Sequence, residues 1–221
     1  ALMGAAALDY PTQIFTGHEQ DINGVSISPD GKYALTAGLD HTARLWDIHT
    51  GQTIRQFDHD NPVKLVAFSP DTRYVLTGDE QNRGAAFRVQ VWDLQTGEKI
   101  HEVIPSASIY TATFSPDGKT VMLGCDDSTL RIWDWQTGQV TRTLSLPVQE
   151  AEIVWAITPD GHYAMSRSMA GYTMKLWALD ESIQQIQEFT YSSDVSNLPA
   201  NQFAFSVDGT LAVMSGASHA L

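Results

Sequence analysis

The chain has 221 residues, of which 43% are hydrophobic and 18% charged, an ordinary composition for a globular protein of one large domain or two small ones. Acidic residues outnumber basic residues by 26 to 13, and the resulting net charge of −13 argues against binding to nucleic acid or to an anionic membrane surface. The single cysteine, Cys125, excludes an intrachain disulfide framework and a multi-cysteine zinc site. No apolar run approaches the roughly 20 residues of a membrane-spanning helix, so we expect no membrane insertion.

Three short motifs recur in the same order along the chain at intervals of roughly 44 residues. A tryptophan followed by an acidic or small residue occurs at Trp46-Asp47, Trp92-Asp93, Trp133-Asp134 and Trp177-Ala178. A Pro-Asp pair lies upstream of each tryptophan, and a Thr-Gly pair follows the first three. Three independent markers in fixed order predict a repeat architecture.

Each repeat predicts four short strands. In the first repeat, the apolar residues Ile22, Val25 and Ile27 lead into a Pro-Asp-Gly turn, in which Asp-Gly is a strong hairpin signal. Two further strands are predicted at residues 33–36 and 42–46, and a fourth at 52–57. Helical periodicity is almost absent, and the one candidate segment, Ile183–Ile186, falls where the repeat predicts a fourth strand.

These motifs resemble the WD40 repeat, the four-stranded blade unit of β-propellers. The first repeat matches best, with Gly17-His18 before the first strand and Asp40 six residues before Trp46-Asp47. The resemblance implies an all-β propeller of four-stranded antiparallel blades. It also implies a structural network of His18, Thr36, Asp40 and Trp46, in which each buried polar group pairs with another.

The later repeats depart from this pattern. The resemblance assigns their network positions to His59, Thr77, Trp92, Asp127, Trp133 and Trp177. The second repeat has about five extra residues in Asp79–Arg88 and no clear aspartate. The third has Pro105 and Leu123 in place of the histidine and the hydroxyl, and the fourth keeps only Ser166 beside its tryptophan. We therefore expect the later blades to depend more on apolar packing.

The repeats divide the whole chain into one propeller region. We expect an orphan fourth strand in residues 1–16, four blades at 17–57, 58–103, 104–146 and 147–190, and a partial fifth blade at 191–221. Propellers of this family usually have seven blades, which at roughly 43 residues each need about 300 residues. We expect an incomplete segment of a larger propeller, completed by missing chain or by another chain. A small closed ring is the alternative.

The search for catalytic and metal-binding residues gives none, and no cofactor is expected. Cys125 ends a predicted strand with no base in the adjacent register, so we expect a buried core thiol. Asp126 and Asp127 are neighbours that point in different directions, and Asp127 belongs to the implied network. His18 and His59 occupy the structural slot, and no histidine pair has the spacing of a zinc site.

The functional signal lies on the face of the ring that carries the loops between strands four and one and between strands two and three. The resemblance places nine residues on this channel-mouth face: Asn23, Lys64, Tyr110, Ile153 and Asn201 where first strands open, Leu39 and Asp126 before the network aspartate, and Arg83 and Phe87 in the insertion. Aromatic and basic side chains around a rigid cavity suit capture of a peptide.

We therefore expect a non-catalytic scaffold that binds a protein or peptide. The alternatives are an enzyme that uses the central channel and a regulatory or assembly segment of a larger multidomain protein, and fold alone does not choose between them. The single cysteine fits the cytoplasm, with a bacterial periplasm or envelope as the second location.

Overall fold

The structure is a computed structural model that describes residues 14–81, 85–148, 152–168, 173–179, 183–190, 203–205 and 212–214. For residues 80–81, 85–87, 155, 190 and the last two segments it describes the backbone alone. All regular secondary structure in these segments is β-strand, so the predicted all-β class is confirmed. Within the described segments there is no helix of the length and hydropathy needed to cross a membrane.

Eighteen strands are described, and sixteen of them form four antiparallel sheets in chain order. The first sheet contains β1 (Ile22–Ile27), β2 (Tyr33–Gly38), β3 (Thr42–Asp47) and β4 (Thr53–Asp58). The second contains β5 (Val63–Phe68), β6 (Tyr74–Gln81), β7 (Ala85–Asp93) and β8 (Lys99–Val103). The third contains β9 (Ile109–Phe114), β10 (Val121–Cys125), β11 (Thr129–Asp134) and β12 (Gln139–Ser145). The fourth contains β13 (Glu152–Ile157), β14 (Tyr163–Ser168), β15 (Thr173–Ala178) and β16 (Gln184–Thr190).

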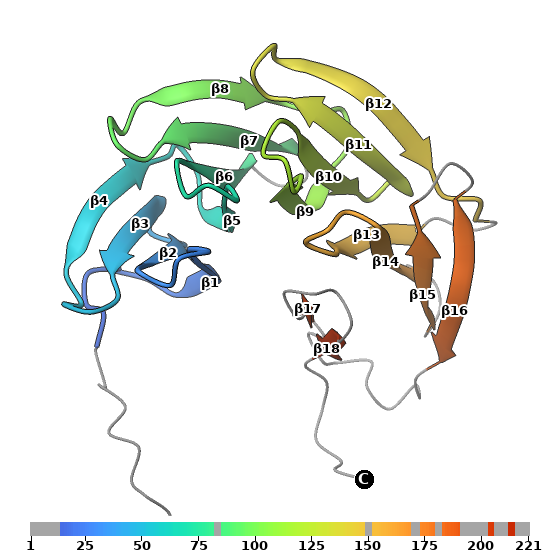
Figure 1. Ribbon diagram of the computed structural model, residues 1–221, viewed down its shortest axis with the longest axis horizontal. Helices are drawn as coiled ribbons and strands as arrows, with labels where there is room; N and C mark the ends of the chain where they lie inside the picture. The colour runs from blue at the N-terminus through green and yellow to red at the C-terminus, as the bar shows by residue number, and fades with distance from the viewer. Residues whose placement is uncertain are drawn as a thin grey trace, which may run out of the picture.

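The four sheets are blades that follow one another around an open arc (Figure 1). Strands β1, β5, β9 and β13 line the inside of the arc, and each contacts the next along the chain. Strands β4, β8, β12 and β16 form the outer rim. A separate pair, β17 (Phe203–Phe205) and β18 (Ala212–Met214), lies on the inner side of the arc. The predicted four-stranded antiparallel blades are therefore confirmed, and β16 covers the segment where the repeat predicted a strand instead of a helix.

The recurring motifs are the turns of these sheets. In the first blade, Ser28 Oγ donates to Asp30 Oδ1 (2.7 Å), and the same serine accepts a hydrogen bond from Tyr33 N (2.9 Å). The aspartate after each of the first three repeat tryptophans caps the next turn, as Asp47 Oδ1 does by accepting from Thr50 N (2.8 Å). Short polar side chains that bond to nearby backbone make such turns predictable from sequence.

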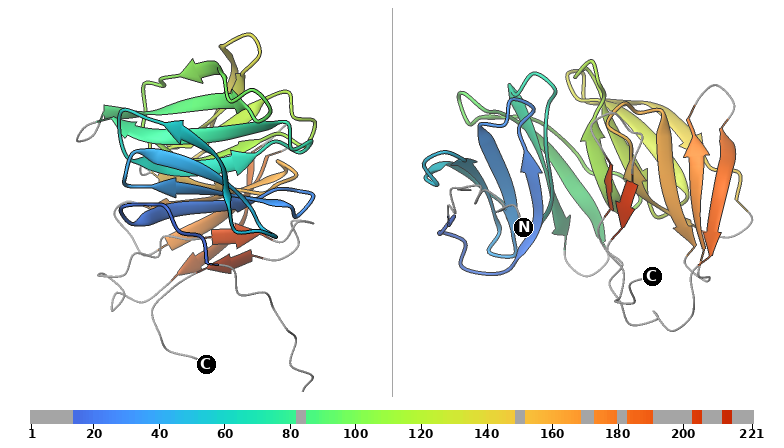
Figure 2. Two further views of the ribbon diagram at one scale, coloured as in Figure 1. Left: turned by 90° about the vertical axis from the view of Figure 1, so that its left-hand side faces the viewer. Right: turned by 60° about the horizontal axis from the view of Figure 1, so that its bottom comes forward.

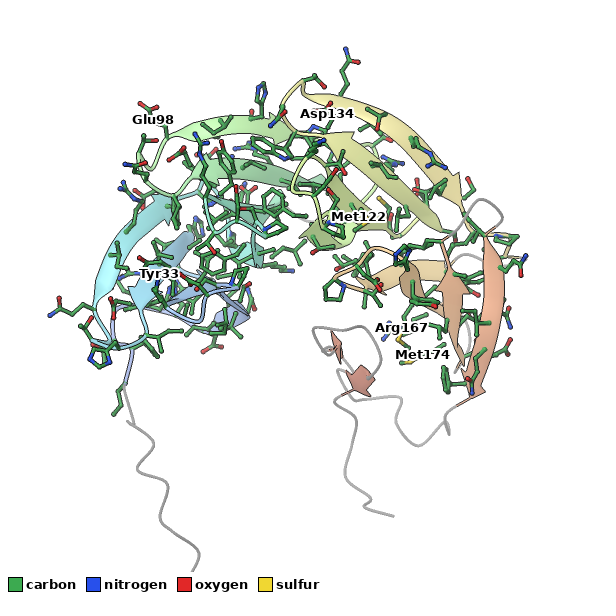
Figure 3. All side chains as sticks on the ribbon, viewed as in Figure 1. Tyr33, Glu98, Met122, Asp134, Arg167 and Met174 are labelled. Carbon is green, nitrogen blue, oxygen red and sulfur yellow. The ribbon has the colours of Figure 1, made fainter. Side chains whose placement is uncertain are left out.

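The cores lie between neighbouring blades, where successive sheets pack face to face (Figures 2 and 3). Leu35, Leu45 and Phe57 of the first blade are buried against Val63 and Val75 of the second. Glycines allow the inner strands to approach, since a Cβ on Gly24 would lie 2.9 Å from the carbonyl oxygen of Lys64.

The chain before β1 covers part of the face of the first blade that carries Trp46, which is the face opposite to the one packed against the second blade. The Phe15 ring lies 5.7 Å from the Trp46 ring, much as Phe57 lies 5.3 Å from Trp92 at the next blade. Val25 and Ile27 on the inner part of this face are 67% and 55% exposed. Most of the expected orphan strand lies outside the described residues, and completion of the ring by further chain stays a prediction.

Candidate functional site

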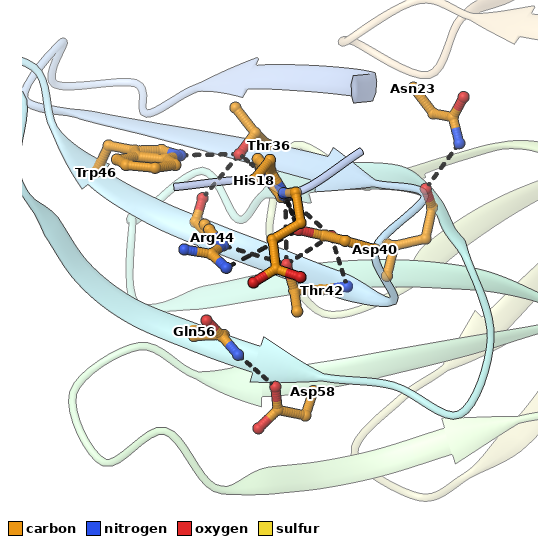
Figure 4. Close-up of polar contacts among 11 residues, drawn as sticks. His18, Asn23, Thr36, Asp40, Thr42, Arg44, Trp46, Gln56 and Asp58 are labelled. Atoms are coloured by element: carbon orange, nitrogen blue, oxygen red, sulfur yellow. Dashed lines mark hydrogen bonds and ion pairs between the residues drawn. The ribbon is translucent and has the colours of Figure 1, made fainter. Parts of the chain in front are cut away.

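The first blade contains a closed polar network (Figure 4). His18 Nδ1 lies 2.9 Å from Asp40 Oδ2, and His18 Nε2 lies 2.7 Å from Thr36 Oγ1. Trp46 Nε1–H donates to the same threonine oxygen (2.8 Å). The structure thus brings together all four residues that the WD40 resemblance assigned to this network. Every donor of these four side chains finds an acceptor when His18 donates from Nδ1 to Asp40, Thr36 donates to His18 Nε2, and Trp46 donates to Thr36.

Asp40 is the charged centre of this network. Burial alone would raise its pKa, but hydrogen bonds from Thr42, from the backbone N–H of Glu19 and from His18 lower the pKa of Asp40 to about 2. Gly38 leaves the room that the network needs, because a Cβ there would overlap both Asp40 and His18. The carboxylate is therefore ionised and fully engaged in holding the blade.

The second blade contains a buried histidine and aspartate that do not bond. His59 Nδ1 lies 3.9 Å from Asp79 Oδ2, both side chains are fully buried, and neither ring nitrogen has a hydrogen-bond partner among the described residues. Burial lowers the pKa of His59 to about 4 and raises the pKa of Asp79. Trp92 Nε1–H still donates to Thr77 Oγ1 (2.8 Å). Asp79 faces the histidine from the β6 position that corresponds to Gly38, but no hydrogen bond joins the two side chains.

The third blade has no such network. The Trp133 Nε1–H is buried without a partner in the described part of the chain, which follows from the apolar Leu123 in the hydroxyl position. Asp127 instead accepts a hydrogen bond from Arg131 Nη2 (2.6 Å), and its side chain is 39% exposed. The expected place of Asp127 in a buried network is corrected, because no histidine faces it and the nearby guanidinium holds it at the surface.

The fourth blade rebuilds the network from a different residue. Trp177 Nε1–H donates to Ser166 Oγ (2.7 Å), and that hydroxyl donates to Glu152 Oε2. Lys175 Nζ lies 2.6 Å from Glu152 Oε1. The expectation of a smaller polar network in this blade is therefore corrected, because Glu152 and Lys175 extend the Trp177–Ser166 pair. The signal in the sequence is that Glu152 opens its strand at a position where the other blades have Ile22, Val63 and Ile109.

The residues expected at the channel mouth share a backbone irregularity in three blades. Asn23, Lys64 and Tyr110 are each the extra residue of a β-bulge at the start of β1, β5 and β9. Asn23 Nδ2 donates to the Val63 carbonyl (3.2 Å), which links the first two inner strands. Asn23 is exposed, and Lys64 and Tyr110 are half-buried. A bulge takes a side chain out of the ladder, so these three residues hold equivalent places on successive strands.

Ile153 does not belong to this set. It pairs in register with Arg167 and is only 3% exposed, so its expected place in an exposed ring is wrong. The bulge of the fourth blade lies two residues later, at Trp155. Because side chains alternate along a strand, the position of a bulge decides which residue leaves the ladder.

Leu39 and Asp126 lie beside the strand openings, in the turns that follow β2 and β10. Leu39 N donates to the Asp21 carbonyl (2.9 Å), and Asp126 Oδ1 accepts from Ser108 N (3.1 Å). These bonds tie the turns to the chain that enters β1 and β9. The structure therefore brings both half-buried residues to the same face as the bulges.

The remaining expected site residues are less fully described. Arg83 and Asn201 lie outside the described residues, and Phe87 lies in β7 with only its backbone described. The extra residues of the second repeat lengthen β6 and β7, with Gln81 paired to Ala85. The described part of the insertion therefore continues the β6–β7 hairpin.

The residues considered for chemistry do not form a reactive centre in the described part of the chain. Cys125 is buried, and burial raises the pKa of its thiol to about 11, which leaves it unreactive. Among the described residues no group of three or more histidine, cysteine, aspartate or glutamate side chains is arranged to hold a metal ion.

Comparison with known families agrees with the turns, blades and tryptophan positions. The family profile described as "WD domain, G-beta repeat" matches residues 9–47, 51–93 and 97–134, which together are more than half of the chain. The chain belongs to the WD40 family. The fourth WD40 blade lies outside these matches, as its Trp177-Ala178 and its glutamate-based network lead one to expect.

Curated WD40 relatives match parts of the chain. The Gallus gallus "Serine-threonine kinase receptor-associated protein" is 27% identical over 183 residues, which are 83% of this chain and 50% of that protein. The Flammulina velutipes "Cross-pathway control WD-repeat protein 2" is 52% identical over 48 residues, or 22% of this chain and 15% of that protein. The Aspergillus fumigatus "Eukaryotic translation initiation factor 3 subunit I" is 36% identical over 70 residues, or 32% and 21%. The matches span at most half the length of these relatives.

Proposed function

We propose that this WD40 chain is a non-catalytic scaffold that binds a protein or peptide segment at the channel-mouth face. The observation that carries the proposal is the recurrence of the bulged residues Asn23, Lys64 and Tyr110 on three successive inner strands. The turns that contain Leu39 and Asp126 flank the same strand openings. At each of these bulges one side chain leaves the regular hydrogen-bond pattern of a rigid sheet. Such a set of side chains at fixed positions is suited to binding a partner.

The chemistry of these residues favours an acidic or amphipathic segment. Lys64 supplies an ammonium group in a chain with only 13 basic residues and a net charge of −13. Asn23 and Tyr110 supply an amide and a phenol, which can both donate and accept hydrogen bonds along a peptide. Tyrosine and arginine are enriched among residues that dominate binding energy, and we include Arg83 and Phe87 of the insertion in the proposed surface.

The names of the relatives support a role in assemblies. One is a receptor-associated protein and another is a subunit of a translation initiation factor. Such names fit the use of WD40 blades as surfaces for other proteins, and we extend that use to this chain.

The test is selection of linear peptides from a displayed library on the wild-type chain, followed by affinity measurements on variants. We expect Lys64→Ala and Tyr110→Ala to weaken the selected peptides by about 1–2 kcal/mol each. The matched controls are Asp30→Ala and Asp117→Ala, which alter the hairpin turns at the other ends of the inner strands. Full affinity in Lys64→Ala and Tyr110→Ala, with loss in the turn variants, would contradict the proposed face.

A further inference from the structure

A cavity of about 370 Å³ lies at the seam between the first and second blades. Tyr33, Leu45 and Ile54 of the first blade line one side, and Thr72, Arg73 and Leu94 of the second line the other. Tyr33 is labelled in Figure 3 at the start of β2. The cavity adjoins the β5–β6 and β7–β8 turns, at the opposite ends of the strands from the bulges. It is therefore separate from the channel-mouth face.

The seam between the second and third blades shows what fits such a place. Trp135 follows Trp133-Asp134 just as Leu94 follows Trp92-Asp93. The Trp135 side chain is 2% exposed, its ring lies 4.6 Å from the Tyr74 ring, and its Nε1–H donates to the Gly118 carbonyl (3.0 Å). Because Tyr74 and Gly118 correspond to Tyr33 and Thr72, the second seam contains an indole where the first has a leucine and a cavity.

The first seam keeps the groups that hold this indole. Tyr33 offers the corresponding aromatic ring, and no described donor bonds to the carbonyl of Thr72, the counterpart of the Gly118 acceptor. Thr72 has a φ of 60°, whereas the same turn position is glycine in the other three blades, at Gly31, Gly118 and Gly161. A threonine held in the left-handed region costs free energy, and such strain concentrates at functional sites.

The guanidinium group of Arg73 lies at the rim of the cavity. The Arg73 side chain is 66% exposed, and its Nε lies 4.0 Å from Asp93 Oδ2, at the limit of an ion pair. We propose that the cavity is a docking site for a tryptophan side chain of a partner peptide, with a neighbouring carboxylate of that peptide paired to Arg73. The indole packs on Tyr33 and donates its N–H to the Thr72 carbonyl, and Arg73 selects the acidic neighbour.

The experiment uses the whole chain and two small probes, N-acetyl-tryptophanamide and the dipeptide acetyl-Asp-Trp-amide, in a titration followed by amide NMR shifts. We expect shifts at Tyr33, Thr72 and Leu94 at millimolar probe, and binding of the dipeptide about threefold or more tighter, as expected of an added ion pair. Arg73→Gln removes that difference between the probes. No localised shifts up to about 10 mM, or an equal response to N-acetyl-leucinamide, overturns the proposal.

Two matched substitutions make the test specific to the seam. Leu94→Trp supplies the indole from within the chain, as Trp135 does, so we expect the variant to fold and to bind N-acetyl-tryptophanamide about tenfold more weakly or not at all. Trp135→Leu opens the second seam, and we expect new shifts at Tyr74 and Gly118. Unchanged probe binding in a folded Leu94→Trp variant overturns the proposal, and this result does not depend on the channel-mouth face.

Discussion

Replacing Asp40 by alanine is expected to destabilise the first blade in a way that depends on pH. The Asp40 side chain is 6% exposed and accepts hydrogen bonds from His18, Glu19 N and Thr42. Its pKa of about 2 lies below the ordinary value of 3.8, and each pKa unit corresponds to about 1.36 kcal/mol. The ionised carboxylate therefore contributes about 2 kcal/mol, and leaving His18 and Thr42 unpaired brings the expected loss to about 2–4 kcal/mol at pH 7.

The sign of the pH dependence follows from the lowered pKa. Because the folded-state pKa lies below the unfolded one, the charge-linked stabilisation is present above pH 3.8 and is lost as pH falls towards 2. By pH 3 about half of it is gone, so the difference between wild type and Asp40→Ala narrows by about 1 kcal/mol.

Urea unfolding followed by circular dichroism at pH 7 and pH 3 measures both effects, and hydrogen exchange of β1–β4 amides assigns them to the first blade. The control is Asp127→Ala, because Asp127 has the corresponding place in the third blade but is 39% exposed and bonds to Arg131 and Thr129. We expect this control to lose less than about 1 kcal/mol. Equal losses in the two variants, or an Asp40→Ala loss that does not change with pH, would refute the reasoning.

Two further predictions concern buried ionisable groups of the fourth and second blades. Glu152→Ala leaves Lys175 and Ser166 without their buried acceptor, and we expect it to lower the free energy of unfolding in urea by about 3 kcal/mol. Glu152→Gln should cost less, because it keeps an oxygen for Ser166. Equal losses in the two variants would show that the charge of Glu152 has no role. Burial lowers the pKa of His59 from the ordinary 6.5 to about 4. The contribution of neutral His59 to the free energy of unfolding is therefore complete above pH 6.5 and falls by about 1–3 kcal/mol as the pH drops to 4. His59→Gln should lack this pH dependence, and the same dependence in both proteins would show that His59 is not the titrating group.

The parts of the fold that the sequence predicts are those fixed by local chemistry. The Ser28-Pro29-Asp30 turn and the Asp47 cap close hairpins through bonds to residues at most five positions away, so a single repeat contains all the necessary information. The network of the first blade was also predictable, because its four members stand at the positions that the resemblance to the WD40 repeat assigns.

The parts that the sequence does not predict depend on which strand position supplies a side chain. Asp79 reaches His59 from the place of Gly38, and Glu152 reaches Ser166 from the first residue of β13. Glu152 stands where the other blades have an apolar residue, and Asp79 stands where they have Gly38, Cys125 and Ser168. An acidic residue in these places is the only signal that the sequence offers. Ile153 was misplaced because the bulge of β13 falls at Trp155, and a ladder shift of this kind leaves no mark in the pattern of residue types.

The differences between repeats therefore carry more functional information than the shared motif. The shared turns and tryptophans give the blades a common four-stranded frame, and within that frame single residues decide which polar or apolar contacts form at a given position. Trp135 fills a seam that Leu94 leaves open, and Leu123 removes the hydroxyl that Thr36 supplies. Because the frame does not change, each blade acts as an internal control for the others. The side chain that fills the equivalent seam of the next blade therefore indicates which kind of side chain a cavity can bind.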